Sequence, residues 1–347
     1  MTKHEFITAD SRSLFNIGNS SVNLIITSPP YPMIQMWDNL FIGYDDSIDK
    51  ALKTGSGKEA YDKMHSILAD VWHECDRVLK DGGFICINIG SAVRTLKDRF
   101  CLYPNQSKIV DFFSDLDYNV LPDVIWRKPS NAPNKFMGSG MYPAGAYVTY
   151  EHEYVLIFRK GKKRIFNERE IECRKRSAYF WEERNVWFSD LWEIKGTVQK
   201  SEFTSTRKRS ASFPFEIPYR LVNMYSIEGD TVLDPFCGLG TTNIACMAAN
   251  RNSIGVDIDS EIISAACQRV ITSIGFLNNV INLRIKKHLN FIDSLSSDKK
   301  ESCYYNSKHN FLVKTKQETN LHLRYLKEIK QYNAEFVCEY DGEKIKE

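Results

Sequence analysis

Apolar runs alternate with segments of helical spacing along the first part of the chain. Residues 21–27 are almost continuously apolar, which is typical of a strand buried on both faces of a parallel sheet. Apolar side chains recur every three or four positions over residues 61–80 and predict a helix, which Asp81-Gly82-Gly83 should end. Shorter apolar segments predict further strands at residues 4–10, 84–89, 120–126 and 153–159.

The same alternation returns in the second half of the chain. It predicts strands at residues 231–234 and 253–257, with helices at 241–250 and 260–273. Strands that alternate with helices in this way indicate an α/β fold around a mostly parallel sheet. Beyond residue 275 the chain is more polar, and we expect a helix near residues 321–332 and no chemistry there.

Composition places the chain among ordinary globular proteins. Its 347 residues, 43% hydrophobic and 26% charged, fit one large catalytic domain with additions, or two domains. No apolar run approaches the length of a membrane span, and the first residues lack a secretory pattern. The nine cysteines contain no C-x-x-C pair. We therefore expect a cytoplasmic protein with reduced thiols, no membrane association and no metal site.

A glycine-rich turn follows the strand at 231–234. Gly238 and Gly240 have no Cβ, so a ligand can approach the backbone there, although a tight strand-to-helix connection would have the same sequence. Thr241 and Thr242 stand where a dinucleotide fingerprint continues toward its third glycine, which disfavours a pyrophosphate. Asp257 ends the next strand, where a carboxylate can accept hydrogen bonds from ribose hydroxyls. S-adenosylmethionine is a ribose-containing cofactor that fits this pattern.

A second turn, Ser28-Pro29-Pro30-Tyr31, follows the strand at 21–27 directly. Two prolines fix φ and remove two N–H donors, which leaves a rigid loop with carbonyl oxygens, a hydroxyl and an aromatic ring. A Pro-Pro turn could simply end a strand. Ligands of open α/β sheets bind at the carboxyl ends of the strands, however, so we expect this turn and the glycine turn to face one crevice.

The two turns resemble the motifs of DNA amino-methyltransferases, which methylate the exocyclic N4 of cytosine or N6 of adenine. TSPPY matches their catalytic motif and DPFCGLGTT their cofactor motif, in the order of the permuted group called beta. The resemblance implies a doubly wound, Rossmann-like methyltransferase fold with an inserted recognition region and a C-terminal extension. Residues 1–160 would form the catalytic half, 161–212 the recognition region, 213–275 the cofactor half and 276–347 the extension.

Roles of single residues follow from this resemblance. The catalytic residues would be Ser28, Pro29, Pro30 and Tyr31. The Ser28 hydroxyl and the Pro29 carbonyl would accept hydrogen bonds from the target amine, and Tyr31 would stack on a base flipped out of the duplex. Contacts to S-adenosylmethionine would come from Asp10, Phe213, Asp234, Pro235, Phe236, Gly238, Gly240, Thr241, Thr242 and Asp257. Asp10 could instead cap a helix with Ser11.

Ser28 bears on the choice of base. Within the resembled family, serine before Pro-Pro accompanies cytosine-N4 enzymes more often and aspartate accompanies adenine-N6 enzymes, so we expect N4-cytosine with N6-adenine as the alternative. Methylation at cytosine C5 needs a nucleophilic cysteine, usually after proline, and the chain has no Pro-Cys pair. Cys237 is expected to be a small packing residue.

The recognition region is rich in positive charge. Residues 159–184 contain ten Lys or Arg against five Glu, and a second basic cluster follows at residues 207–209. A charge run is usually a solvated surface, but the resemblance places target recognition here. We expect double-stranded DNA to contact Arg174, Lys175, Arg176, Arg207, Lys208 and Arg209.

A partner endonuclease that cuts the same DNA site is also expected, because the role we expect of a DNA amino-methyltransferase is to protect host DNA from such an enzyme.

Other functions agree less well with the motifs. The competing hypotheses are a methyltransferase of RNA or of protein glutamine, a dinucleotide-dependent oxidoreductase, and a non-catalytic DNA-binding protein with a methyltransferase shell.

Overall fold

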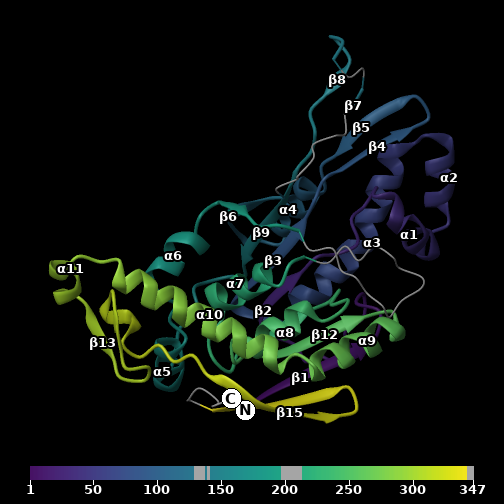
Figure 1. The fold of residues 1–347 in the computed structure, drawn as a ribbon. Coiled ribbons are helices and arrows are strands. Elements are labelled where there is room, and N and C mark those ends of the chain that lie inside the picture. Colours follow the sequence, from purple (N-terminus) through teal and green to yellow (C-terminus); the bar gives the residue numbers. More distant parts are fainter. Residues whose placement is uncertain (129–136, 139–140, 197–212, 342–347) are drawn as a thin grey trace.

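A ten-stranded mixed sheet forms the centre of the molecule in the computed structural model, which describes residues 1–128, 137–138, 141–196 and 213–341. The strands lie in the order β10-β6-β9-β3-β2-β11-β12-β1-β16-β15 (Figure 1). These strands are β1 (Thr2–Thr8), β2 (Val22–Thr27), β3 (Leu79–Ile89), β6 (Asn119–Arg127), β9 (His152–Arg159), β10 (Leu191–Glu193), β11 (Thr231–Asp234), β12 (Asn252–Asp257), β15 (Tyr325–Tyr332) and β16 (Glu335–Asp341).

Helices cover both faces of this sheet, and short two-stranded sheets lie outside it (Figure 1). The helices are α1 (Asp38–Tyr44), α2 (Ser47–Thr54), α3 (Gly57–Val78), α4 (Asn105–Asp115), α5 (Glu168–Arg176), α6 (Trp181–Trp187), α7 (Glu216–Tyr225), α8 (Thr241–Ala248), α9 (Ser260–Ile271), α10 (Ile274–Asp293) and α11 (Ser297–Glu301), with 3-10 turns η1 (Gln35–Trp37) and η2 (Lys316–Glu318). The remaining strands pair two by two: β4 (Ala92–Leu96) with β5 (Arg99–Tyr103), β7 (Met137–Gly138) with β8 (Ala146–Tyr147), and β13 (Tyr304–Asn306) with β14 (Phe311–Val313).

The central strands run parallel, as the apolar runs predict. Strands β3, β2, β11, β12 and β1 pair parallel with one another, while β9 and β16 are antiparallel to their neighbours. The carboxyl ends of the parallel strands therefore share one edge of the sheet. The turn after β2 and the turn after β11 both leave from that edge.

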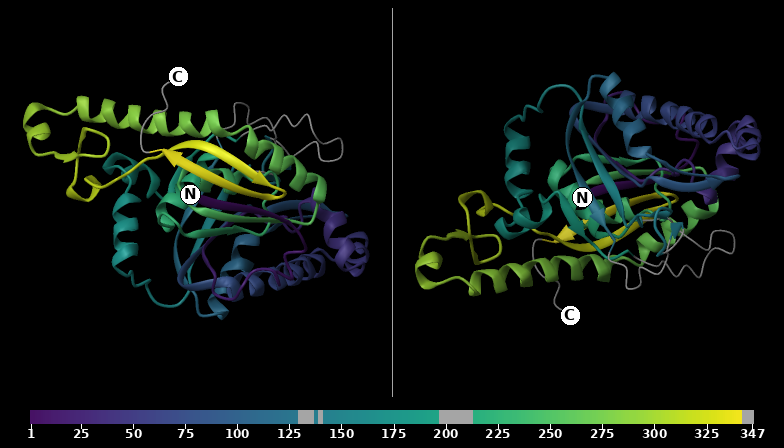
Figure 2. Two further views of the ribbon diagram at one scale, coloured as in Figure 1. Left: turned by 90° about the horizontal axis from the view of Figure 1, so that it is seen from below. Right: turned by 90° about the horizontal axis from the view of Figure 1, so that it is seen from above.

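Strand β2 is buried on both faces, which explains its continuous apolar sequence. All six of its residues are buried. Leu24 and Ile26 contribute to the core beneath α7, α8, α9 and α10, whereas Ile25 contributes to the core beneath α3 and α4. Figure 2 shows these helices on opposite sides of the sheet. Neighbouring residues of a strand point to opposite faces, so one short segment anchors both cores.

The prediction of a helix at residues 321–332 is wrong. Most of that segment forms β15, which pairs with β16, and β16 pairs in turn with β1. Asn333, with a left-handed φ of 57°, turns the chain between the two strands. Phe336 is completely buried and meets Phe6 of β1 edge to face, with ring centroids 5.9 Å apart. Burial of this ring on the sheet edge outweighs the weak local preference for a helix.

The C-terminal extension also anchors the region between β9 and β10. Arg284 of α10 is buried and donates to both carboxylate oxygens of Glu183 of α6, at 2.5 and 2.8 Å. Its guanidinium also donates to the Tyr219 hydroxyl, at 3.1 Å. Beside this pair, the His288 imidazole contacts Glu182 at 2.8 Å. Helix α6 therefore packs on α10, and β10, within the range 161–212, belongs to the main sheet.

The Arg284–Glu183 pair yields a stability prediction. Glu183→Gln leaves a buried guanidinium without its counter-charge, and we expect the free energy of unfolding to fall by about 3 kcal/mol. Glu172→Gln breaks an exposed pair with Lys175 on α5 and should change it by less than about 0.5 kcal/mol. Chemical denaturation at neutral pH measures both. Equal losses in the two variants would contradict the buried pair's role.

Candidate active site

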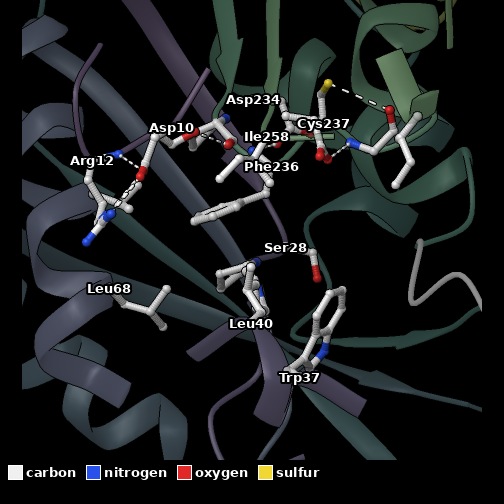
Figure 3. A pocket seen from close by; sticks show the side chains of 18 of the residues that line it. Asp10, Arg12, Ser28, Trp37, Leu40, Leu68, Asp234, Phe236, Cys237 and Ile258 are labelled. Atoms are coloured by element: carbon white, nitrogen blue, oxygen red, sulfur yellow. Dashed lines mark hydrogen bonds and ion pairs between the residues drawn. The ribbon is translucent and has the colours of Figure 1, made fainter. Parts of the chain in front are cut away.

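The proline turn and the glycine turn open onto one cavity at the carboxyl edge of the sheet. Ser28, Pro29 and Pro30 line it after β2, and residues 234–239 and Thr241 line it after β11. Asp10, Phe213 and Asp257 complete the same wall. In Figure 3, Ser28 lies between the Trp37 indole and the residues of the glycine turn. The crevice expected from the sequence is therefore present.

Asp234 connects the two turns through hydrogen bonds. Its buried carboxylate accepts hydrogen bonds from the hydroxyl of Thr27 at 2.8 Å, from that of Thr242 at 2.6 Å and from the Phe236 N–H at 3.1 Å. Burial raises the pKa of Asp234 to about 6, although these hydrogen bonds oppose the rise. The sequence indicates a cofactor contact for Asp234 and Thr242. The structure shows that their side chains bond to each other and hold the proline turn against the start of α8.

The two glycines of the turn have different functions. Gly240 has a φ of +70°, and a Cβ there would lie 2.8 Å from the Phe6 ring, so packing alone requires a glycine. Gly238 has a φ of +49°, but a Cβ there would meet no atom within 4 Å. Because Gly238 also lines the cavity, its bare backbone is open to a ligand. Of the pair, Gly238 fits the predicted cofactor contact.

Asp257 and Asp10 bring two carboxylates to the cavity wall. Asp257 ends β12 and accepts hydrogen bonds from the N–H groups of Gly238 at 3.2 Å and Asp259 at 3.0 Å. These bonds fix its carboxylate at the mouth of the glycine turn, where a ribose could reach it. Asp10 pairs with Arg12 at 2.7 Å, and the guanidinium stacks 3.8 Å from the centre of the Tyr44 ring. No helix begins at Asp10, so the capping alternative is wrong.

The remaining predicted cofactor contacts lie in or beside this cavity. Phe213 is buried there, and Pro235 accepts a hydrogen bond from the Ser11 hydroxyl through its carbonyl. The Thr241 hydroxyl accepts a hydrogen bond from Arg269 at 2.9 Å. Cys237 is buried, and burial raises the pKa of its thiol well above the ordinary value. It behaves as a packing residue, as expected.

Tyr31 does not line the cavity that Ser28 lines, and its expected stacking on a flipped base stays a prediction. Its ring is buried and lines a second cavity, on the other side of the proline turn, together with Gly90, Lys128, His152 and Glu153. Its hydroxyl donates to the Glu153 carboxylate at 2.8 Å. Asn88 also donates to this hydroxyl at 2.8 Å, and Lys128 forms an ion pair with Glu153. None of these three residues was assigned a role from the sequence. The sequence feature that could have indicated Lys128 and Glu153 as site residues is their position, as charged residues, beside the ends of predicted strands.

The three predicted DNA contacts that the structure describes do not line the cavity. Arg174, Lys175 and Arg176 belong to α5, where Arg176 pairs with Glu228 at 2.7 Å, and Lys175 pairs with Glu172. Arg174 stacks on Phe166. Glu228 precedes β11, so α5 lies at the amino edge of the sheet, opposite the cavity; Figure 1 shows α5 at that end of the molecule. Arg207, Lys208 and Arg209 fall outside the described residues.

Comparison with known proteins agrees with this geometry. The DNA methylase family that includes N6 and N4 methylases matches residues 22–268. The chain belongs to this family of DNA methylases. It is 46% identical over 341 residues to the Type II methyltransferase M.MthZI of Methanothermobacter thermautotrophicus, covering 96% of this chain and 95% of the relative. It is 47% identical to M.MjaI of Methanocaldococcus jannaschii, over 75% and 89% of the two chains.

Solved structures support the fold of this methylase. A candidate DNA modification methylase of Thermus thermophilus, solved with S-adenosyl-L-methionine, has a TM-score of 0.58 and 28% identity, over 77% of this chain and 94% of the other. The PvuII DNA methyltransferase, described as cytosine-N4-specific, shares the fold at a TM-score of 0.53 and 16% identity, over 82% and 94%.

Several predictions from the sequence are thereby confirmed: the Rossmann-like methyltransferase fold, a DNA amino-methyltransferase of restriction-modification type, and S-adenosylmethionine as the methyl donor. No helix in the described ranges is both long and apolar enough to cross a membrane. Among those same residues, no group of three or more His, Cys, Asp or Glu could hold a metal ion.

The buried Asp234 carboxyl predicts an unusual pH dependence of stability. Its pKa is raised to about 6 in the folded protein from an ordinary 3.8, so the folded state binds this proton more tightly. The extra stability that this proton gives the folded protein is fully present below pH 3.8 and is lost as pH rises through about 6. It amounts to roughly 3 kcal/mol. We expect wild type to lose stability relative to Asp234→Asn, by that order, between about pH 4 and pH 7, because asparagine does not titrate. A difference independent of pH, measured by denaturation, would contradict this.

Proposed function

We propose that this methylase transfers a methyl group from S-adenosylmethionine to the exocyclic N4 of a cytosine flipped out of duplex DNA. The observation that carries the proposal is Ser28, a neutral hydroxyl on a rigid turn that lines the cavity beside the glycine turn. The SPPY sequence favours cytosine N4. Adenine N6 is the alternative, because a hydroxyl can accept a hydrogen bond from either amino group.

The residues of the cavity fit the methyl donor. Gly238 leaves backbone open to a ligand, Asp257 offers a carboxylate of the kind that binds ribose hydroxyls, and Phe236 and Phe213 supply apolar surface. Asp10 with Arg12 offers paired charges at the wall for the zwitterionic amino-acid end. When bound, S-adenosylmethionine supplies an electrophilic methyl group on a sulfonium.

The chain itself would prepare the nucleophile. The lone pair of an exocyclic aromatic amine is delocalised into the ring, so the nitrogen is a weak nucleophile. Acceptors at both N–H groups draw the nitrogen toward tetrahedral geometry and localise the lone pair. The Ser28 Oγ and the Pro29 carbonyl are the proposed acceptors. Two prolines hold them rigidly, and Asp234 anchors the strand that carries them, so positioning should supply much of the rate.

The biological role is proposed from the named relatives, which are Type II methyltransferases. We infer that methylation protects host DNA from a partner endonuclease that cuts the same site. Arg207, Lys208 and Arg209 remain the proposed phosphate contacts. For Arg174, Lys175 and Arg176 we favour a structural role, because their partners lie at the edge of the sheet opposite the cavity.

The identity of the modified base is the direct test. Duplex DNA methylated by the enzyme is digested to nucleosides and analysed by mass spectrometry. We expect N4-methylcytosine. N6-methyladenine as the sole product would refute the proposed base while leaving the methyltransferase assignment intact.

The two turns can be tested separately. Asp257→Asn should weaken S-adenosylmethionine binding by about 10- to 100-fold, the usual effect of losing hydrogen bonds to a charged acceptor. Ser28→Ala should leave that affinity within about twofold and lower kcat by roughly 100-fold or more. Calorimetry measures the first quantity and transfer of a tritiated methyl group to DNA the second. Loss of cofactor binding in Ser28→Ala would show that the assignment of the two turns is wrong.

A further inference from the structure

The hydroxyl of Ser28 belongs to a hydrogen-bonded chain that leads away from the cofactor cavity. Its Oγ lies 3.1 Å from the Tyr31 hydroxyl, which donates to the Glu153 carboxylate at 2.8 Å. The Asn88 amide donates to the same carboxylate oxygen at 2.7 Å and to the Tyr31 hydroxyl at 2.8 Å. Lys128 forms an ion pair with the other oxygen of Glu153. The chain therefore ends on a carboxylate beside a lysine.

The direction of each bond follows from counting hydrogens. A phenol has one hydrogen, and an ionised carboxylate at 2.8 Å attracts it more strongly than a neutral hydroxyl at 3.1 Å. Burial raises the pKa of Tyr31 well above its ordinary value, with Glu153 adding to the rise, so the phenol keeps that hydrogen. The bond between Ser28 and Tyr31 can then form only if Ser28 donates.

The Asn88 amide supports the same assignment. Turning the amide over would place its oxygen 2.7 Å from a carboxylate oxygen, which is repulsive. The amide nitrogen therefore faces Glu153 and Tyr31. At 3.5 Å from the Ser28 Oγ, it competes little for the lone pairs of that oxygen.

We propose that Glu153 is a positioning residue for methyl transfer, which acts through Tyr31 to direct the Ser28 hydrogen away from the cavity. Ser28 then presents lone pairs to the target amine and acts as an acceptor. A hydroxyl free to rotate would spend part of its time pointing its hydrogen at the amine, where it repels the N–H group that must be bound. This inference rests on the proposed role of Ser28, and it explains how a neutral hydroxyl can serve the amine as an acceptor only.

The test compares Glu153→Gln, Tyr31→Phe and the double variant in transfer of a tritiated methyl group to duplex DNA. We expect each single variant to lower kcat by roughly 100-fold with KM for S-adenosylmethionine within about twofold. Because both changes remove the same constraint on Ser28, the double variant should be no slower than the worse single variant. Glu153→Asp keeps the charge and should recover part of the loss.

The matched control is Glu339→Gln, which breaks another lysine–glutamate pair, with Lys330 on the β15–β16 hairpin far from the cavity. It should keep wild-type kcat. Wild-type kcat in Glu153→Gln, or losses that multiply in the double variant, would overturn the inference. If Glu153→Gln does not fold, Tyr31→Phe with wild-type kcat overturns it equally. Activity retained in Ser28→Ala would instead refute the proposed role of Ser28, so the two failures are distinguishable.

Discussion

The buried carboxylate of Asp234 is the interaction on which the catalytic geometry depends. It joins Thr27, the residue before the proline turn, to Thr242 in the first turn of α8 and to the backbone of the glycine turn. A carboxylate in this apolar environment is expensive to bury unless donors surround it, and the raised pKa of Asp234 reflects that cost. Two turns distant in sequence are thereby held at a fixed separation, which a reaction between two bound molecules requires.

Residues of the proline turn line two cavities, and the side chains in the two cavities differ. The first cavity combines the backbone of Gly238, the carboxylate of Asp257 and apolar side chains. The second is lined by Tyr31, Lys128 and Glu153, and the buried Asn88 donates to the Tyr31 hydroxyl behind them. Ser28 stands between them, so its hydroxyl can be oriented from one cavity while it serves the other. A rigid Pro-Pro turn suits this position because it has no N–H groups to compete for the same partners.

The C-terminal extension contributes structure. Its hairpin covers β1, the last parallel strand of the sheet, with β16, and α10 supplies Arg284 to the ion pair with α6. An uncovered strand would expose backbone donors and acceptors, and the lysines of β15 discourage further pairing at the new edge. Arg174, Lys175 and Arg176 of α5 have partners from their own part of the chain or from the turn before β11. A run of positive charge in a sequence does not reveal whether its partners are phosphates or glutamates.

The sequence by itself determined the strands of the parallel sheet, the order of the two motifs and the class of cofactor. These features are local: an apolar run, a pair of prolines or a pair of glycines is read within a few residues. Only the tertiary structure decided the structural roles of Asp234, Thr242 and Gly240. It also decided the burial of Tyr31 and the strand at residues 325–332. Each of these depends on a partner far away in the chain, such as Thr27, Phe6, Glu153 or β16, and hydrophobic periodicity carries no information about such partners.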